Sequence, residues 1–207
     1  MYSVEVIDKG DTSITIRMNG FPIQYANALR RICLNGVPTF AIETVDVIEN
    51  TSIFADEYLA HRLALVPLTT PPDKYSMPDE SDSEEEDIYS SCSVMLVLDS
   101  GKTDQTTDVT SARLSSEDPD VRPVNDNIPI ATLAPMQKVV MECHARLGRG
   151  TEHAKWNSAN ISVLTGTEED GFELKVETAG SLNPADIIVA GMKELSVRLE
   201  DFRQVIG

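Results

Sequence analysis

A helical stripe of apolar residues near the N-terminus dominates the hydrophobic pattern of the chain. Its members stand at i, i+4, i+7 and i+8 and so share one face of a helix: Tyr25, Leu29, Ile32 and Cys33. Pro22 suits the first turn of this helix, and Asn35-Gly36 suits its end, where a residue with positive φ closes the last carbonyls. Arg30 and Arg31 project about 100° apart, so only one of them can flank the stripe.

A second and longer stripe ends the chain. Asn183 suits the N-cap of its helix, and Pro184 suits the first helical position. The stripe comprises Ile188, Leu195, Leu199, Phe202 and Ile206, widened by Ile187 and Val205. Such a face can pack on a sheet of its own domain, but its width also suits an interface shared with another chain.

Alternating and continuous apolar runs elsewhere in the chain predict strands. A hairpin is expected within residues 1–18, and a short helix capped by Asp56 is expected to run to Leu63. Further strands are predicted at 40–49, 93–99, 138–145, 160–164 and 172–177, with a weaker one at 108–114. The fold class is therefore α+β.

The charge and composition of the chain restrict the kinds of partner that it can bind. The 207 residues carry a net charge of −17, which repels phosphate and makes direct nucleic-acid contact unexpected. Seven carboxylates fall within residues 79–87, and a self-repelling run of this kind predicts a mobile acidic loop at about 72–88. No apolar run approaches a membrane span and no signal-peptide core is seen, so a cytoplasmic protein is expected.

Residues able to do chemistry are few and scattered. Cys33, Cys92 and Cys143 are widely spaced and lack a Cys-x-x-Cys pair, which argues against a disulfide framework and a thiolate metal site. His61 has no second histidine or cysteine nearby, and the Gly148-Arg149-Gly150 string lacks the strand-turn-helix context of a phosphate loop. An enzyme acting alone is not expected, because no catalytic constellation is present.

Several strings resemble one known family. Residues 27–32, Asn-Ala-Leu-Arg-Arg-Ile, are followed by a Gly-Val-Pro break and resemble the alpha-type assembly subunits of multisubunit RNA polymerases. Residues 56–68 resemble the archaeal and eukaryotic branch of this family rather than the bacterial alpha subunits. Residues 127–137 and 148–156 also resemble the archaeal members, so the resemblance covers nearly the whole chain.

The resemblance implies a discontinuous α/β dimerisation domain with an inserted, mostly β domain. The dimerisation domain would comprise residues 1–40 and 157–207, and the insert residues 41–156. Some family members bind zinc or an iron–sulfur cluster through cysteines of the insert. Only Cys92 lies at the corresponding strand entry here, so both are predicted absent.

The implied function is non-catalytic assembly of a DNA-directed RNA polymerase. The chain would pair with a small alpha-like subunit (L) and form the platform for subunits N and P and the second-largest catalytic subunit. By position in the family motif, Arg30 and Arg31 would face that large subunit. The dimer interface would use Tyr25, Leu29, Ile32, Ile188, Leu195, Leu199, Phe202 and Ile206.

Two alternatives remain open. A bacterial-style alpha subunit would pair with itself, and it is expected to continue past the position of Gly207 with a linker and a DNA-contacting domain. Sizing of the purified chain separates that case. A non-polymerase adaptor sharing the dimerisation fold is the other alternative, and co-purification with the large polymerase subunits separates it.

Overall fold

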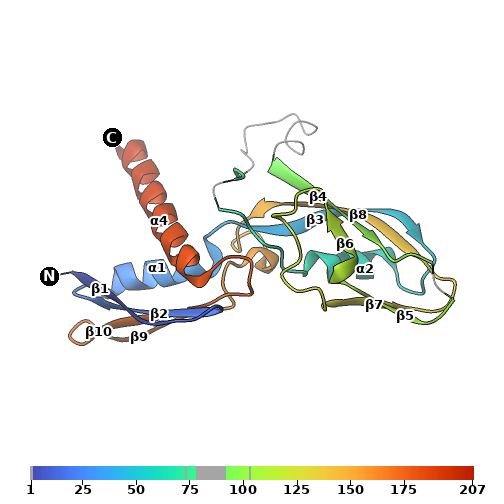
Figure 1. Ribbon diagram of the computed structural model, residues 1–207. Helices are drawn as coiled ribbons and strands as arrows, with labels where there is room; N and C mark the ends of the chain where they lie inside the picture. Colours follow the sequence, from blue (N-terminus) through green and yellow to red (C-terminus); the bar gives the residue numbers. More distant parts are fainter. Residues whose placement is uncertain (1, 73, 78–91, 103) are drawn as a thin grey trace. The chain divides into compact units, whose positions relative to one another are not determined.

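The computed structural model describes residues 2–72, 74–77, 92–102 and 104–207 (Figure 1). The chain divides into two compact units. The first unit comprises the residues up to Pro38 together with Arg149–Gly207, and the second unit is Thr39–Gly148. The boundary on the return of the chain lies between Gly148 and Arg149, ahead of the predicted one between 156 and 157. Helices and antiparallel sheets occur together, which confirms the predicted α+β class.

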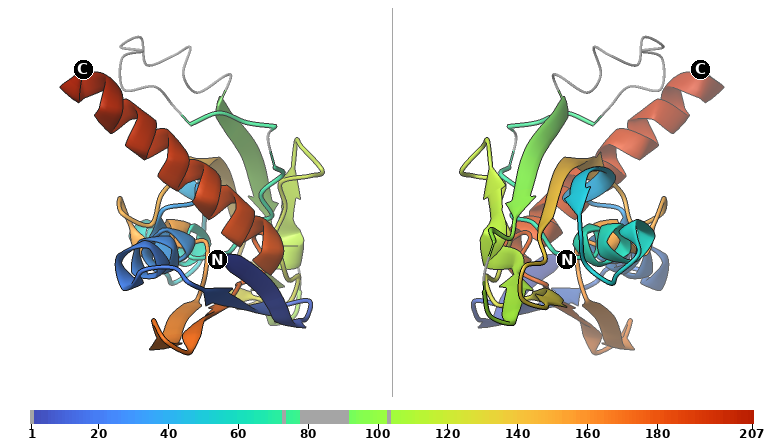
Figure 2. Two further views of the ribbon diagram at one scale, coloured as in Figure 1. Left: turned by 90° about the vertical axis from the view of Figure 1, so that its left-hand side faces the viewer. Right: turned by 90° about the vertical axis from the view of Figure 1, so that its right-hand side faces the viewer.

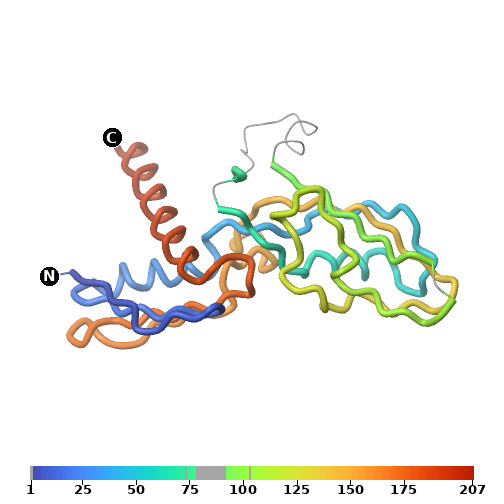
Figure 3. Tube along the Cα trace, viewed as in Figure 1, coloured from blue at the N-terminus to red at the C-terminus, as the bar shows by residue number. Residues whose placement is uncertain are grey.

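The first unit is an antiparallel sheet with two helices on one face. The strand order is β1-β2-β10-β9, so the N-terminal hairpin pairs with strands from the far end of the sequence (Figure 3). The strands are β1 (Ser3–Lys9), β2 (Ser13–Asn19), β9 (Ile161–Thr167) and β10 (Gly171–Glu177). The helices are α1 (Ile23–Asn35) and α4 (Pro184–Ile206).

The core of the first unit lies between this sheet and its helices. In β2 and β10 alternate residues are buried, as expected for strands with one covered face. They meet apolar residues of α1 and α4 in one cluster, whose members include Ile16, Met18, Leu29, Cys33, Leu174 and Ile187. Fully burying side chains of this size stabilises the unit by roughly 1.5–3 kcal/mol each.

The helix ends differ in detail from the predictions. Pro22 is the N-cap of α1 rather than its first residue. Gly36 follows α1 with φ −101°, so the predicted positive φ is wrong. A Cβ on Gly36 would stand about 3.0 Å from Ile32 Cα, so space rather than handedness favours glycine there. Asn183 is the N-cap of α4 as predicted, but its side-chain amide donates to Asp186 instead of accepting from the backbone.

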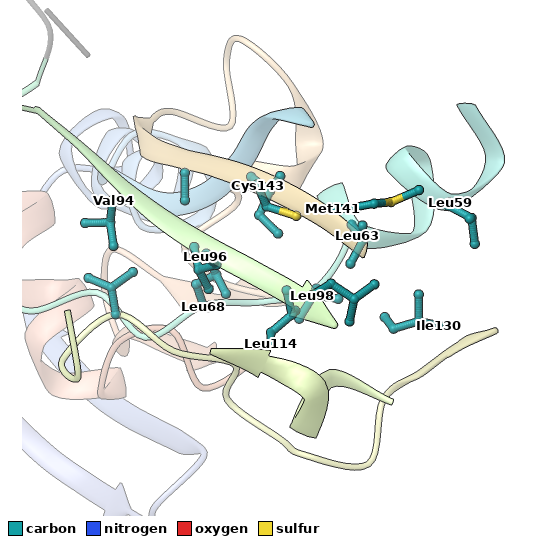
Figure 4. Close-up of a cluster of buried hydrophobic side chains, with 14 of the residues drawn as sticks. Leu59, Leu63, Leu68, Val94, Leu96, Leu98, Leu114, Ile130, Met141 and Cys143 are labelled. Atoms are coloured by element: carbon teal, nitrogen blue, oxygen red, sulfur yellow. The ribbon is translucent and has the colours of Figure 1, made fainter. Parts of the chain in front are cut away.

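Among the described residues of the second unit, a four-stranded antiparallel sheet in the order β3-β8-β4-β6 is accompanied by a two-stranded β5-β7 sheet and by the helix α2 (Asp56–Ala64). The strands are β3 (Thr39–Asn50), β4 (Ser93–Asp99), β5 (Thr107–Thr110), β6 (Leu114–Ser116), β7 (Pro129–Leu133) and β8 (Val139–Gly148). Leu96 and Leu98 of β4 and Met141 of β8 pack with Leu59 and Leu63 of α2 (Asp56–Ala64) in a continuous apolar core (Figure 4).

Three predictions in the second unit need correction or fall outside the described residues. The N-cap of α2 is Ala55, and Asp56 accepts a hydrogen bond from Asn50 instead. The strand predicted at 108–114 is two short strands separated by a 3₁₀ turn, Ser111–Arg113. The acidic run lies within residues 78–91, which are outside the described part of the chain, as is part of the predicted loop at 72–88.

A polar cluster joins two distant segments of the second unit. The Lys74 ammonium lies 2.9 Å from Asp118 Oδ1 and 2.7 Å from Asp120 Oδ2, and the Tyr75 hydroxyl also donates to Asp118. The Tyr75 ring packs edge-on against Phe40 at a centroid distance of 5.0 Å. The hydrogen bonds from Lys74, then Tyr75 and the backbone N–H of Asp120, lower the pKa of Asp118 to about 2.

The pH dependence of stability tests this cluster. A carboxylate whose folded pKa is about 2 stabilises the fold above its ordinary pKa of about 4, and that stabilisation is lost as the pH falls toward 2. We expect Asp118→Asn to lower the free energy of unfolding by about 2 kcal/mol at pH 6, with the difference from wild type shrinking toward pH 2. Urea unfolding between pH 2 and 6 measures this.

The matched control is Asp104→Asn, an exposed carboxylate of the same unit. Its effect should be small throughout the range. A wild-type chain whose advantage over Asp118→Asn stays constant down to pH 2 would contradict the account.

Candidate protein–protein interface

Helix α4 changes from buried to exposed along its length. Ile187, Ile188 and Gly191 are buried, whereas the described side chains from Ser196 onward are all exposed. Figures 1 and 2 show this outer half standing clear of the sheet of its own unit. Three large apolar side chains of the predicted stripe lie there, with exposed fractions of 59% for Leu199, 64% for Phe202 and 69% for Ile206.

The inner half of the same helix crosses α1 closely. A Cβ added to Gly191 would lie 3.2 Å from Cys33 Sγ and 3.5 Å from Ile32 Cγ2, so the two helices approach at this residue. Leu195, one turn further along, is half-buried against the core of the unit. The stripe recognised in the sequence is therefore one continuous face with two different surroundings.

The remaining predicted interface residues do not lie on the open part of that face. Leu29, Ile32 and Ile188 are buried in the core of the first unit. Tyr25 is half-buried and stacks on Phe21, with ring centroids 5.2 Å apart. Leu29 and Ile32 of α1 thus pack with Ile188 of the inner half of α4, and none of the four residues adds to the exposed outer half.

Strand β1 adds exposed apolar residues that are not among the predicted interface residues. Val4 pairs with Met18 and Val6 with Ile16, so both valines point to the core side of the sheet. Nevertheless all of β1 is exposed, because the helices of the unit cover β2 and β10 instead. The alternation of Val4 and Val6 with polar residues could have indicated an apolar strand face from the sequence. It does not say which residues or which chain cover that face.

We give the name open apolar surface to the exposed residues of the predicted stripe on the outer half of α4 together with the two valines on the core side of β1; its members are Val4, Val6, Leu199, Phe202, Val205 and Ile206. The α4 members share one helical face, and exposed apolar patches of this kind are characteristic of surfaces that bind other proteins. It offers no polar constellation of the kind that a small-molecule site requires.

The predicted arginine pair divides into two different roles. Arg30 is half-buried and donates from Nε to Asn27 Oδ1 at 2.9 Å, while its backbone carbonyl accepts from Ser162 Oγ at 2.8 Å. The Arg31 side chain is exposed, and its guanidinium forms no hydrogen bond or ion pair with any residue that the structure describes. Arg31 is therefore the member of the pair with its guanidinium available to another protein.

The candidate chemical groups stay apart. Cys33 and Cys143 are buried, and burial raises the pKa of each thiol to about 12, which keeps them protonated and inert. His61 is exposed. Across residues 2–72, 74–77, 92–102 and 104–207, no three His, Cys, Asp or Glu side chains gather as a metal site would require. The absence of zinc or an iron–sulfur cluster stays a prediction.

The helices of the described residues are also too short or too polar to cross a membrane.

Comparison with known proteins identifies the family. A family model described as the RNA polymerase Rpb3/RpoA insert domain matches residues 42–167. DNA-directed RNA polymerase subunit Rpo3 of Pyrococcus furiosus is 46% identical over 153 residues, which cover 74% of this chain and 55% of the relative. The same subunit of Thermococcus kodakarensis is 43% identical over 156 residues, covering 75% and 56%.

A more distant relative extends the aligned region. Rpo3 of Aeropyrum pernix is 38% identical over 168 residues, which cover 78% of this chain and 58% of the relative. The chain thus spans a little over half the length of the curated relatives that it matches. The family model and these relatives confirm the resemblance seen in the sequence. The chain therefore belongs to the Rpb3/RpoA family of DNA-directed RNA polymerase subunits, with archaeal Rpo3 proteins among its relatives.

Proposed function

We propose that this chain is a non-catalytic assembly subunit of a DNA-directed RNA polymerase, and that it forms a heterodimer with a small alpha-like subunit (L). The observation that carries the proposal is the open apolar surface, in a chain that belongs to a polymerase subunit family. The outer half of α4 is long, apolar on one face and exposed, as a helix that completes its packing against a second chain would be.

The energetics support a stable heterodimer. Burying Leu199, Phe202, Ile206 and the two β1 valines at roughly 1.5–3 kcal/mol each amounts to on the order of 10 kcal/mol gross. The loss of translational and rotational freedom on association offsets much of this gain. The small subunit must therefore cover β1 as well as α4, and we propose that it does both.

Charge favours a different chain as the partner over a second copy. Each copy carries a net charge of −17, so self-pairing brings two strongly acidic chains together. A less acidic small subunit avoids this repulsion. We further propose that the heterodimer is the platform for subunits N and P and for the second-largest catalytic subunit, with Arg31 directed at the latter.

Substitution of Leu199 tests the heterodimer. We expect Leu199→Asp to abolish co-elution with the small alpha-like subunit, because a carboxylate would be buried in an apolar seam. The fold should persist, since the side chain is exposed in the isolated chain. Size-exclusion chromatography of the two purified subunits measures this.

Ile53→Asp is the matched control, because Ile53 is an exposed apolar residue of the second unit. It should co-elute as wild type does. Equal co-elution of Leu199→Asp and wild type, or self-association of the chain without any partner, would contradict the proposed heterodimer.

Substitution of Arg31 tests the large-subunit contact separately. We expect Arg31→Ala to leave the heterodimer intact and to weaken capture of the second-largest subunit by about tenfold, the loss of one or two charge-assisted hydrogen bonds. A pull-down with the preformed heterodimer measures it. Arg113→Ala, at an exposed arginine of the second unit, serves as the control. Capture that does not distinguish Arg31→Ala from Arg113→Ala would refute this role.

A further inference from the structure

Arg149 connects three segments of the first unit. Its Nε donates to the Gly36 carbonyl at 3.2 Å, immediately after the last residue of α1. Its Nη2 donates to Glu194 Oε2 of α4 at 2.9 Å. Its own backbone N–H is held by Glu152 Oε1 at 2.8 Å. One guanidinium therefore bridges the end of α1 and the middle of α4.

The Arg149 bridge is largely shielded from solvent, and the backbone next to it packs closely against α1. The Arg149 and Glu194 side chains are only 28% and 21% exposed, so water competes less for this pair than for a surface ion pair. The neighbouring backbone lies hard against α1, because a Cβ on Gly150 would stand 2.7 Å from the Cβ of Asn35. The Arg149 backbone is thus held in place, and its planar guanidinium donates to two acceptors whose directions are fixed, the Gly36 carbonyl and the Glu194 carboxylate.

Glu194 lies at the point along α4 where the helix changes from buried to exposed. Gly191, where α4 crosses α1, is buried, and the fully exposed part of the helix begins at Ser196. Glu194 lies between the two. Beyond it, the ion pairs described for α4 are internal to the helix, Arg198 with Glu194 and Arg203 with Glu200. The bridge is therefore located where the supported half of the helix gives way to the unsupported half.

We infer that Arg149 is a positioning residue for the subunit interface, and that its bridge from Gly36 to Glu194 sets the direction in which the outer half of α4 leaves the unit. The inference rests on the proposed heterodimer. The helix extends about 18 Å from Glu194 to Ile206 at 1.5 Å per residue, so a rotation of about 10° at Glu194 moves Ile206 by about 3 Å. A displacement of that size is enough to misalign Leu199 and Phe202 with a packed partner surface.

The test measures the direction of α4 in the full chain without a partner. Spin labels attached through Thr165→Cys of β9 and Gln204→Cys of α4, both at exposed positions, report the distance between the sheet and the helix tip by pulsed electron paramagnetic resonance. Cys92→Ser removes a competing thiol, and the buried Cys33 and Cys143 do not compete for label. The wild-type bridge predicts a narrow distance distribution.

Glu194→Gln removes the negative charge that Arg149 pairs with but keeps the hydrogen bond from Arg149 to the Gly36 carbonyl, so we expect the fold to be retained. We expect its distance distribution to broaden or to shift by about 3 Å, and its Kd for the small alpha-like subunit to rise about tenfold. Arg149→Lys, whose single ammonium cannot serve both acceptors, should give an intermediate broadening. Arg198→Gln removes only the internal pair to Glu194 and should match wild type in the distance measurement.

A Glu194→Gln distribution that superimposes on wild type would overturn the inference, as would equal broadening by Arg198→Gln. Failure of the wild-type chain to bind the small subunit at all would instead reject the proposed heterodimer. In that case the distance distributions still decide whether Arg149 directs the helix.

Discussion

The packing of α4 across α1 at Gly191 is the contact on which the rest of the first unit depends. It buries Ile187 and Ile188 against the same core that Leu29, Cys33 and the β2 and β10 residues fill. A Cβ at position 191 would already be tight against Cys33 Sγ at 3.2 Å and in contact with Ile32 Cγ2 at 3.5 Å, so a side chain larger than that of alanine would have to push the helices apart. The crossing anchors one half of a long helix and leaves the other half outside the unit.

This arrangement explains how one chain can be well folded and still have an incomplete surface. The inner half of α4 stabilises its own unit, and the outer half presents an apolar face that its own unit leaves exposed. The same division is seen in the sheet, where β2 and β10 are covered and β1 is not. If the proposed heterodimer forms through this face, folding and assembly use different residues of the same elements, and substitutions in the exposed half would change assembly without loss of the fold.

Much of the fold follows from the sequence, because local patterns determine it. The spacing of Tyr25, Leu29 and Ile32 predicts α1, and Asn183-Pro184 marks the start of α4 where the structure has it. Helix caps were less predictable. Asp56 accepts a hydrogen bond from Asn50 instead of capping the helix, and Gly36 is favoured by the lack of space beside Ile32 and not by a positive φ. The interface was only partly predictable, because periodicity identifies an apolar face but does not say which chain covers it. Leu29 and Ile188 therefore resemble Leu199 in the sequence although they lie in different surroundings, and the partners of Arg149 become its neighbours only through the fold.

Hydrogen–deuterium exchange, with and without the small alpha-like polymerase subunit, tests most directly whether the open apolar surface is where that subunit binds. The account predicts that backbone amides of residues 196–206 exchange quickly in the isolated chain and become strongly protected in the mixture. Those of the β4 core strand should not change, because they are already buried within the second unit. Unchanged exchange across 196–206 in a mixture that does form a complex would contradict the central claim.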